Sequence, residues 1–483
     1  MVMGPEFVSL AGLVTLFVTM GLRSGNGRQL LAQVFYHTAT TRPPILIVAT
    51  LAGWAGVMKM SEKCGLKVAK VIGPAAPLKP FTTFRCAVFL FDAILACRLL
   101  PIMVSRSIYG TDPKASFVLV GDICAYVCCL VALVMPPSHF CFPTKEGESY
   151  SASRSAAHAK YGHGLLAETS HSRDSLAWTL WETLLAPFAP VTFWHVIVAD
   201  YATSLAKGLG DAHVTACVAA QAFFDVDTIK EHSLWWEARR GSCASSWLNA
   251  SALALPFWCR LFQCCAAYKE TRHPKNLWNA LKYATAFPLI YVGYLEKKYK
   301  DGYIYLFVAA AILQSSATFF WDIFMDWGLC EKKDNGLFFG LFKPTFRKSF
   351  VYSNVFLSST ALVAFDLSLR FLWTLAVFGD VSTRGFGLFI FELAEILRRT
   401  VWALFRIEWE LVATDNILID EEESDKKGGP KTTKPLLDDD DDDNEKYVNQ
   451  PPSPAETNHK VESSPHAITA AGVDCATSGR LSV

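Results

Sequence analysis

Residues Tyr303–Phe324 read YIYLFVAAAILQSSATFFWDIF, a run of 22 residues whose only charged side chain is that of Asp322. An α-helix needs about 20 mostly apolar residues to cross the hydrocarbon core of a bilayer. The run is therefore long and apolar enough to span a membrane as a single helix. It predicts that the chain is an integral membrane protein.

Runs of the same kind lie along most of the chain, on both sides of this segment. The first is followed by a polar loop rather than by a small-residue cleavage site, so we expect it to remain as a helix. A shorter, Trp-rich stretch, Leu176–Leu185, is expected to lie along the membrane interface. The fold class is therefore all-α, with about ten transmembrane helices. Besides Tyr303–Phe324, the expected spans are Glu6–Leu22, Pro44–Met58, Phe81–Val104, Ala115–Met135, Pro190–Ala220, Trp247–Cys265, Trp278–Tyr294, Asn354–Phe378 and Phe386–Phe405.

The composition of the 483-residue chain supports this class and argues against others. Hydrophobic residues make up 52% of the chain and charged residues 19%, whereas an ordinary soluble domain has about 25% charged residues. The formal net charge is zero. Because no basic field is present, the sequence does not indicate a nucleic-acid partner.

The cysteines and histidines do not form a recognisable metal motif. Most of the 14 cysteines lie inside apolar runs, and no CxxC pair is matched by a second one at zinc spacing. A cysteine in an apolar helix usually serves as a small hydrophobic residue, so we expect neither a disulfide nor a metal site. His158, His163 and His171 lie in a Ser/Ala/Gly-rich loop and are expected to be solvated. We therefore expect no metal and no cofactor.

The distribution of polar residues divides the chain into four parts. Residues 1–137 are expected to form a four-helix membrane scaffold, residues 138–175 a polar cytosolic loop, and residues 176–410 a transport domain made of the last six spans. Residues 411–483 are rich in Pro, Ser, Lys and Asp, and they include the run Asp438–Asp443. Such a segment cannot bury enough apolar surface to fold. We expect a disordered acidic tail that is either solvated or bound to a basic cytosolic partner.

Basic residues in the short loops predict the orientation of the chain. The loop after the second span carries five lysines against the single Glu62, and the loop after the eighth span is also basic. Because short cytosolic loops are enriched in Lys and Arg, we expect the N-terminus and, after ten spans, the C-terminus in the cytosol. One observation opposes this orientation, because Lys297, Lys298 and Lys300 then face the lumen or the exterior.

Ionisable residues inside the later spans are the most informative feature of the sequence. Each costs about 2.5–3.5 kcal/mol at a helix centre on insertion scales. The alternative is that they neutralise one another, since Asp366–Arg370 and Glu395–Arg399 have i, i+4 spacing. However, five of the last six spans carry at least one unpaired candidate, so we expect them to surround a polar cavity or an ion path. The residues are Asp200, Arg260, Lys282, Asp322, Asp326, Asp366, Arg370, Glu392, Glu395, Arg398 and Arg399.

The kinds of charge point to an anion as the permeating species. Five of these residues are cations, and four of the five are arginines, whose planar fork matches phosphate oxygens in bidentate fashion. Asp200 and Asp322 are expected to accept hydrogen bonds from a partly protonated anion, or to hold the arginines apart when the site is empty. The aromatic side chains of Tyr283 and Trp373 are expected to line the path. The pattern favours inorganic phosphate.

Six stretches carry a family resemblance. They are Ala199–Leu205, Trp258–Arg272, Asn279–Tyr283, Trp321–Leu329, Asp366–Thr374 and Glu395–Glu408. Taken in order, they resemble the EXS family, named for Erd-type, retrovirus-receptor-type and Syg-type proteins, which includes plant and animal phosphate exporters. The resemblance implies a ten-helix membrane protein whose last six helices line a phosphate path.

The resemblance also implies which residues contact phosphate. Thr203 stands where we expect an asparagine in the animal exporters, which puts its role in doubt. The implied phosphate-binding residues are Asp200, Thr203, Arg260, Lys282, Tyr283, Asp322, Arg370, Trp373, Arg398 and Arg399.

One departure from the larger exporters concerns the start of the chain. Those proteins carry a long cytosolic SPX domain, whereas membrane spans begin here at about Glu6. The chain therefore resembles the short Erd-type branch, which implies a Golgi membrane and recycling of phosphate from its lumen to the cytosol. A plasma-membrane location is the alternative, and a homodimer is left open.

Two rival functions can be compared with transport. An enzyme is not expected, because the sequence lacks GxxxxGK[ST], GxSxG and HExxH motifs. A non-transporting receptor or retention factor for Golgi glycosyltransferases would suit the acidic tail. It would not explain why cations are buried in the spans at the cost of insertion.

Overall fold

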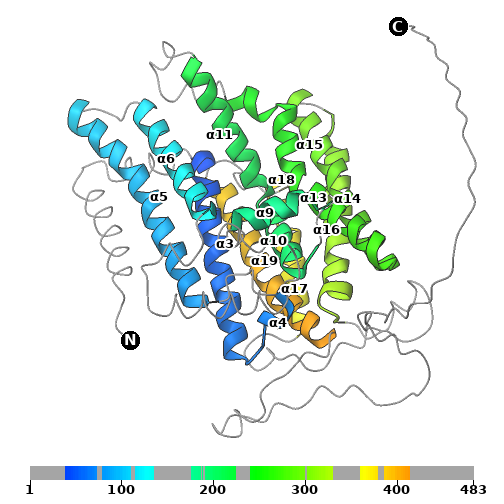
Figure 1. Ribbon diagram of the computed structural model, residues 1–483. Coiled ribbons are helices and arrows are strands. Elements are labelled where there is room, and N and C mark those ends of the chain that lie inside the picture. Colours follow the sequence, from blue (N-terminus) through cyan, green and yellow to red (C-terminus); the bar gives the residue numbers. More distant parts are fainter. Residues whose placement is uncertain are drawn as a thin grey trace, which may run out of the picture. The chain divides into compact units, whose positions relative to one another are not determined.

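A computed structural model describes the fold of the chain. The described residues are 38–72, 79–109, 115–134, 176–186, 188, 191–224, 240–299, 302–329, 359–378 and 386–413. Their regular structure is helical throughout, with no strand among them, which confirms the all-α class (Figure 1). Five described helical segments are long and apolar enough to cross a membrane, as expected for an integral membrane protein: Thr40–Lys63, Pro80–Ser105, Trp247–Thr271, Ile304–Asp326 and Ser359–Val377.

Some predictions fall outside the described residues. They include the first predicted span, Glu6–Leu22, and almost all of the acidic tail, so the total of ten spans remains a prediction. The predicted interfacial stretch forms a short helix, α9 (Leu176–Leu184), which packs against α10 (Phe193–Ser204).

The helices of the predicted scaffold pack closely against one another. These are α3 (Thr38–Lys63), α5 (Pro80–Tyr109) and α6 (Ala115–Val134), and α5 contacts both of the others. Arg98 of α5 and Asp122 of α6 form an ion pair in which both side chains are 3% exposed. Because both charges are out of water, each needs the other to offset its loss of hydration.

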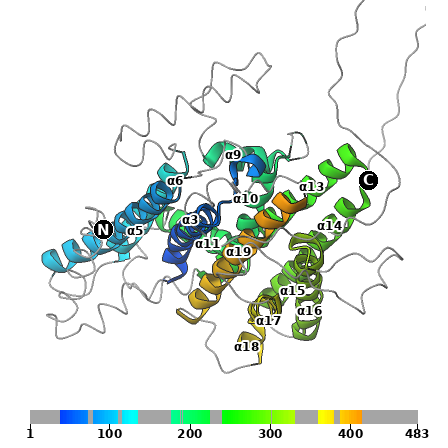
Figure 2. The same cartoon turned by 90° about the horizontal axis from the view of Figure 1, so that it is seen from below.

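Helix α19 (Phe386–Ala413) lies at the centre of the described helices. It packs against α3, α10 and α17 (Ser359–Arg370), and in Figures 1 and 2 it separates α3 from α16 (Ile304–Trp321) and α17. Gly53 allows α3 to approach α19 closely, because a Cβ at this position would overlap the hydroxyl of Thr400 in α19. Close backbone contact at small residues is typical of helices that pack within membranes.

Three predicted spans are interrupted rather than continuous, which corrects the sequence analysis. The span predicted at residues 190–220 is divided at Leu205, the span at 278–294 is divided at Thr285, and the span at 354–378 turns at residues 371–372. In addition, α16 continues into the π-helix η3 (Asp322–Asp326). The segments beyond the three breaks are α11 (Ala206–Phe224), α15 (Ala286–Tyr299), which follows α14 (Pro274–Ala284), and α18 (Trp373–Val377).

Helix α13 (Trp247–Thr271) is continuous and well capped. Ser246 accepts a hydrogen bond from the backbone of Leu248 at its start, and Arg272 ends it in the left-handed conformation. The helix packs against α10, α11, α14 and α15.

A disulfide between Cys217 of α11 and Cys243 contradicts the expectation that the cysteines form none. The prediction was wrong because it treated Cys217 as part of an apolar helix. Helices α11 and α13 pack against each other, and Cys243, shortly before α13, lies beside Val214 and Val218 of α11.

Candidate functional site

The helix interruptions coincide with charged residues. Asp200 precedes the break between α10 and α11, Lys282 precedes the break between α14 and α15, and Arg370 precedes the turn after α17. Asp322 begins the π-helix. Discontinuous helices are a common way to build an ion or substrate site inside a membrane, because irregular backbone is tolerated there only where it lines a polar space.

Threonine hydroxyls bind the backbone beside two of these breaks. Thr203 Oγ1 donates to the carbonyl of Asp200 at 2.7 Å, and Thr285 Oγ1 donates to the carbonyl of Lys282 at 2.6 Å. Hydroxyls that bond back to the preceding turn compete with the helical ladder and bend helices. We infer that these bonds help to place Asp200 and Lys282.

The first group of side chains gathers around Asp200. Its Oδ1 accepts hydrogen bonds from Arg260 Nε at 2.8 Å and from the Tyr283 hydroxyl at 2.6 Å. Arg260 Nη1 also donates to Gln263 Oε1 at 2.5 Å, and Gln263 Nε2 donates to the carbonyl of His195 at 3.2 Å. Arg260 is therefore held rigidly in the interior and does not snorkel to the surface.

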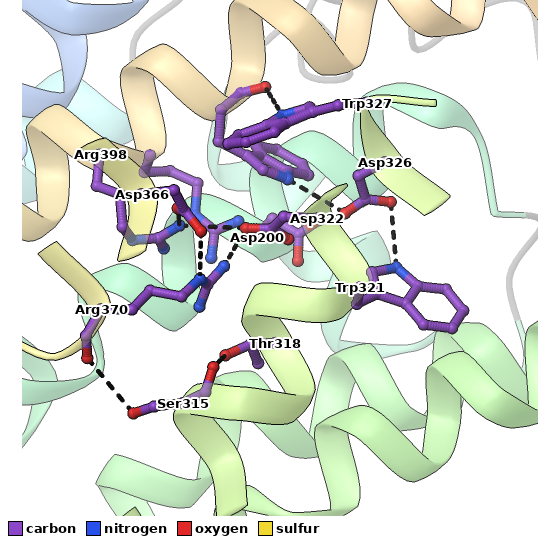
Figure 3. A network of polar contacts seen from close by, with 12 residues as sticks. Asp200, Ser315, Thr318, Trp321, Asp322, Asp326, Trp327, Asp366, Arg370 and Arg398 are labelled. Atoms are coloured by element: carbon purple, nitrogen blue, oxygen red, sulfur yellow. Dashed lines mark hydrogen bonds and ion pairs between the residues drawn. The ribbon is translucent and has the colours of Figure 1, made fainter. Parts of the chain in front are cut away.

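The second group links η3, α17 and α19 (Figure 3). Arg370 Nε donates to Asp366 at 2.9 Å, and Nη2 of the same guanidinium contacts Asp322. Arg398 Nη1 lies 3.2 Å from Asp366 Oδ1 and 3.4 Å from Asp322 Oδ2. The predicted Asp366–Arg370 pair therefore exists, but it is one edge of a four-residue network rather than a closed pair.

The other pair suggested by i, i+4 spacing does not form. Glu395 makes its ion pair with Arg398, at 2.7 Å from Nη2, and not with Arg399. It also accepts a hydrogen bond from Ser204 at 2.7 Å. Arg398 pairs at the same time with Glu395, with Asp366 of α17 and with Asp322 of η3, whereas Arg399 turns toward Thr203 and Ser204.

Two buried cations of the site form no ion pair among the described residues. They are Lys282, which is 7% exposed, and Arg399, which is 8% exposed. Lys282 Nζ lies 4.0 Å from the ring centroid of Tyr283 and 5.1 Å from that of Trp321. These contacts orient the ammonium group, and the Asp326 carboxylate attracts it without forming an ion pair.

Arg399 is bound by hydroxyl groups and an aromatic ring. Its Nε donates to Ser204 Oγ at 2.9 Å and its Nη2 donates to Thr203 Oγ1 at 3.2 Å. Its guanidinium carbon lies 4.6 Å from the ring centroid of Trp402. Thr203 thus contacts Arg399 directly.

Counted as ionised, the five predicted cations of the site are matched by five carboxylates. Four of these carboxylates, Asp200, Asp322, Asp366 and Glu395, pair with arginines, and the fifth, Asp326, lies near Lys282. Lys282 and Arg399 form no ion pair with any of them, so both cations can interact with a bound anion. The arrangement therefore suits an anion with several acceptor oxygens.

Trp373, the last predicted residue, lies at the edge of this cluster. Its Nε1 donates to Ser315 Oγ at 3.1 Å, and Ser315 in turn donates to the carbonyl of Arg370 at 3.4 Å. The indole thus braces the turn after α17.

Several residues of the cluster were missed by sequence reasoning. Gln263 is one turn from Arg260, and Ser204 adjoins Thr203, so their positions offered a weak signal. Ser315, Trp321 and Trp402 offered none, since apolar spans often contain such residues.

A further buried cluster lies outside the predicted site. Arg42, which precedes the predicted span Pro44–Met58, lies in α3 with its side chain 2% exposed. It contacts Asp211 of α11 and lies 3.5 Å from Glu392 of α19. The prediction was wrong because α3 begins earlier than its apolar run does.

Comparison with known proteins places these features in a family. The model of the EXS family matches residues 38–412. The chain belongs to the EXS family. The match takes in all of the interrupted helices and α3, α5 and α6 as well.

Three curated relatives illustrate how far the similarity of this EXS protein extends. A xenotropic and polytropic retrovirus receptor 1 homolog from Danio rerio is 30% identical over 257 residues, which are 50% of this chain and 35% of the relative. Solute carrier family 53 member 1 from Homo sapiens is 28% identical over 270 residues, with the same two shares. SPX and EXS domain-containing protein 1 from Dictyostelium discoideum is 27% identical over 253 residues, 50% of this chain and 25% of the relative. The matched segments are thus about a third or less of the relatives' own lengths.

Proposed function

We propose that this EXS protein transports inorganic phosphate across its membrane along a path that passes the charged cluster. The observation that carries the proposal is the pair of buried cations, Lys282 and Arg399, that form no ion pair among the described residues. Burying a cation without an ion-pair partner in a membrane protein is costly. That cost is offset when an anion occupies the site.

The chemistry around these cations favours phosphate over a simple halide. Arg399 offers a planar guanidinium, which pairs well with phosphate oxygens. Asp200 can accept a hydrogen bond from a protonated phosphate oxygen, and a fully ionised anion such as chloride has no proton to give. Transport is supported by relatives that include proteins named as solute carriers.

Reconstitution tests this function directly. We expect purified protein in liposomes to take up radiolabelled phosphate far faster than protein-free liposomes, with competition by unlabelled phosphate and little by chloride. Well-folded protein without phosphate flux would contradict transport and would favour a receptor or retention factor.

We further propose that the protein carries phosphate from the Golgi lumen to the cytosol. The Cys217–Cys243 disulfide supports the orientation, because disulfides persist in oxidising compartments. With a cytosolic N-terminus, the loop that joins the spans predicted at 190–220 and 247–265 faces the lumen, where such a bond is stable. We expect a tagged protein to colocalise with Golgi markers, and a signal confined to the plasma membrane would contradict this placement.

A further inference from the structure

The carboxylate of Asp326 joins two tryptophan side chains from different helices. Trp321 Nε1 donates to its Oδ1 at 3.1 Å, and Trp402 Nε1 donates to its Oδ2 at 3.1 Å (Figure 3). Trp321 ends α16 and Trp402 belongs to α19. Each carboxylate oxygen thus serves one indole, and Asp326 bridges the two helices.

Each of the two indoles also supports one of the cations that form no ion pair, and the Asp326 carboxylate attracts Lys282 directly as well. Lys282 lies over Trp321, at 5.1 Å from the ring centroid, and Arg399 lies over Trp402, at 4.6 Å. Cations within about 6 Å of a ring centroid are attracted to its face. The positions of Lys282 and Arg399 are therefore coupled to each other through the two rings and Asp326.

Asp326 is itself held in place from both sides. The π-helix η3 puts it five residues after Trp321, a spacing that matches the wider π turn. Gly328, at φ +53°, follows this segment, and a Cβ there would overlap the ring of Trp409. From α19, Arg406 Nε lies 3.6 Å from Asp326 Oδ1. These contacts help to hold the carboxylate in the orientation in which it accepts from both indoles.

We propose that Asp326 is a positioning residue for the phosphate site, which holds Lys282 and Arg399 in place by fixing the two indoles against which they rest. The inference rests on the proposed phosphate transport. Without the bridge, the rings and their cations gain freedom, and the cations can turn toward nearby carboxylates instead of phosphate. Binding then weakens although no group that contacts phosphate is lost.

Substitution of Asp326 by asparagine keeps the shape of the side chain but changes the bridge. It also removes a charge that attracts Lys282 directly, so the tryptophan variants below are needed to isolate the bridge. An amide has one acceptor oxygen, and its NH₂ group is a donor. Asp326→Asn therefore serves one indole and places a donor against the N–H of the other. We expect the phosphate concentration for half-maximal flux to rise about tenfold, the scale of one lost hydrogen bond to a charged group, with a smaller change in maximal flux.

Variants in which one tryptophan at a time is replaced test the same bridge and leave the charge of Asp326 unchanged. Trp321→Phe and Trp402→Phe keep an aromatic ring under each cation but remove the indole N–H. We expect each to raise half-saturation by a smaller factor than Asp326→Asn. In the double variant with Asp326→Asn, Trp402→Phe should raise half-saturation by a smaller factor than it does alone, because both changes affect the same Trp402–Asp326 hydrogen bond.

Trp327→Phe is the matched control. Trp327 is 1% exposed and donates to the backbone carbonyl of Trp402 at 3.3 Å, so its substitution also removes a buried indole bond in this region. Trp327 follows Asp326 in the chain, but its indole N–H does not donate to the Asp326 carboxylate. We expect a lower melting temperature for Trp327→Phe and an unchanged half-saturation in liposomes.

The assay distinguishes failure of the inference from failure of the proposed function. If wild-type protein transports phosphate but folded Asp326→Asn shows wild-type half-saturation, or Trp327→Phe shows an equal shift, the bridge has no positioning role. If wild-type protein shows neither flux nor stabilisation by phosphate, the proposed function fails and this inference falls with it.

Discussion

Lys282→Ala and Arg399→Ala are each expected to lower phosphate flux about 10- to 100-fold while leaving the protein folded. A hydrogen bond to a charged group is worth about 1.5–3 kcal/mol, which corresponds to that range. Neither substitution leaves a carboxylate without its ion-pair partner, because neither cation forms an ion pair among the described residues. Flux in liposomes and the melting temperature of the purified protein are the measurements.

Arg98→Ala is the matched control for these two variants. It also removes a buried cation, but one that pairs with Asp122 between α5 and α6, away from the cluster. Breaking a buried pair costs about 3–5 kcal/mol, so we expect a large loss of stability and normal flux per folded molecule. Wild-type flux in Lys282→Ala and in Arg399→Ala would show that these cations do not bind phosphate.

The double exchange Asp366→Arg with Arg370→Asp is expected to abolish flux and to destabilise the protein by several kcal/mol. A closed intrahelical pair would tolerate the exchange, since it preserves net charge. In the structure, the exchange puts a new guanidinium beside Arg398 and a new carboxylate beside Asp322. Like charges at buried sites repel and lose their compensation.

Arg370→Lys is the milder companion to this exchange. Lysine keeps the charge but cannot reach Asp366 and Asp322 with one planar fork. We expect a folded protein with flux reduced about tenfold. Full phosphate flux in a well-expressed double-exchange variant would show that transport does not need Arg370, either in the charged network or at the phosphate site.

The sequence predicted the helical class and the identity of the buried charges because both follow from hydropathy and residue type. It did not predict where helices break, since Leu205 and Thr285 carry no Gly or Pro signal. It paired Glu395 with Arg399 instead of Arg398, because the correct pairing depends on Asp322 of η3 and Asp366 of α17. Tertiary contacts between distant segments decide these points, and the same holds for Cys217–Cys243 and for Arg42.

The most direct test of the central claim is an experimental structure of the protein in phosphate, compared with one in phosphate-free buffer. The account predicts tetrahedral density within hydrogen-bond distance of Lys282 or Arg399, near Asp200, in the phosphate sample alone. Phosphate density that touches neither cation, or carboxylates that pair with both of them, would contradict it.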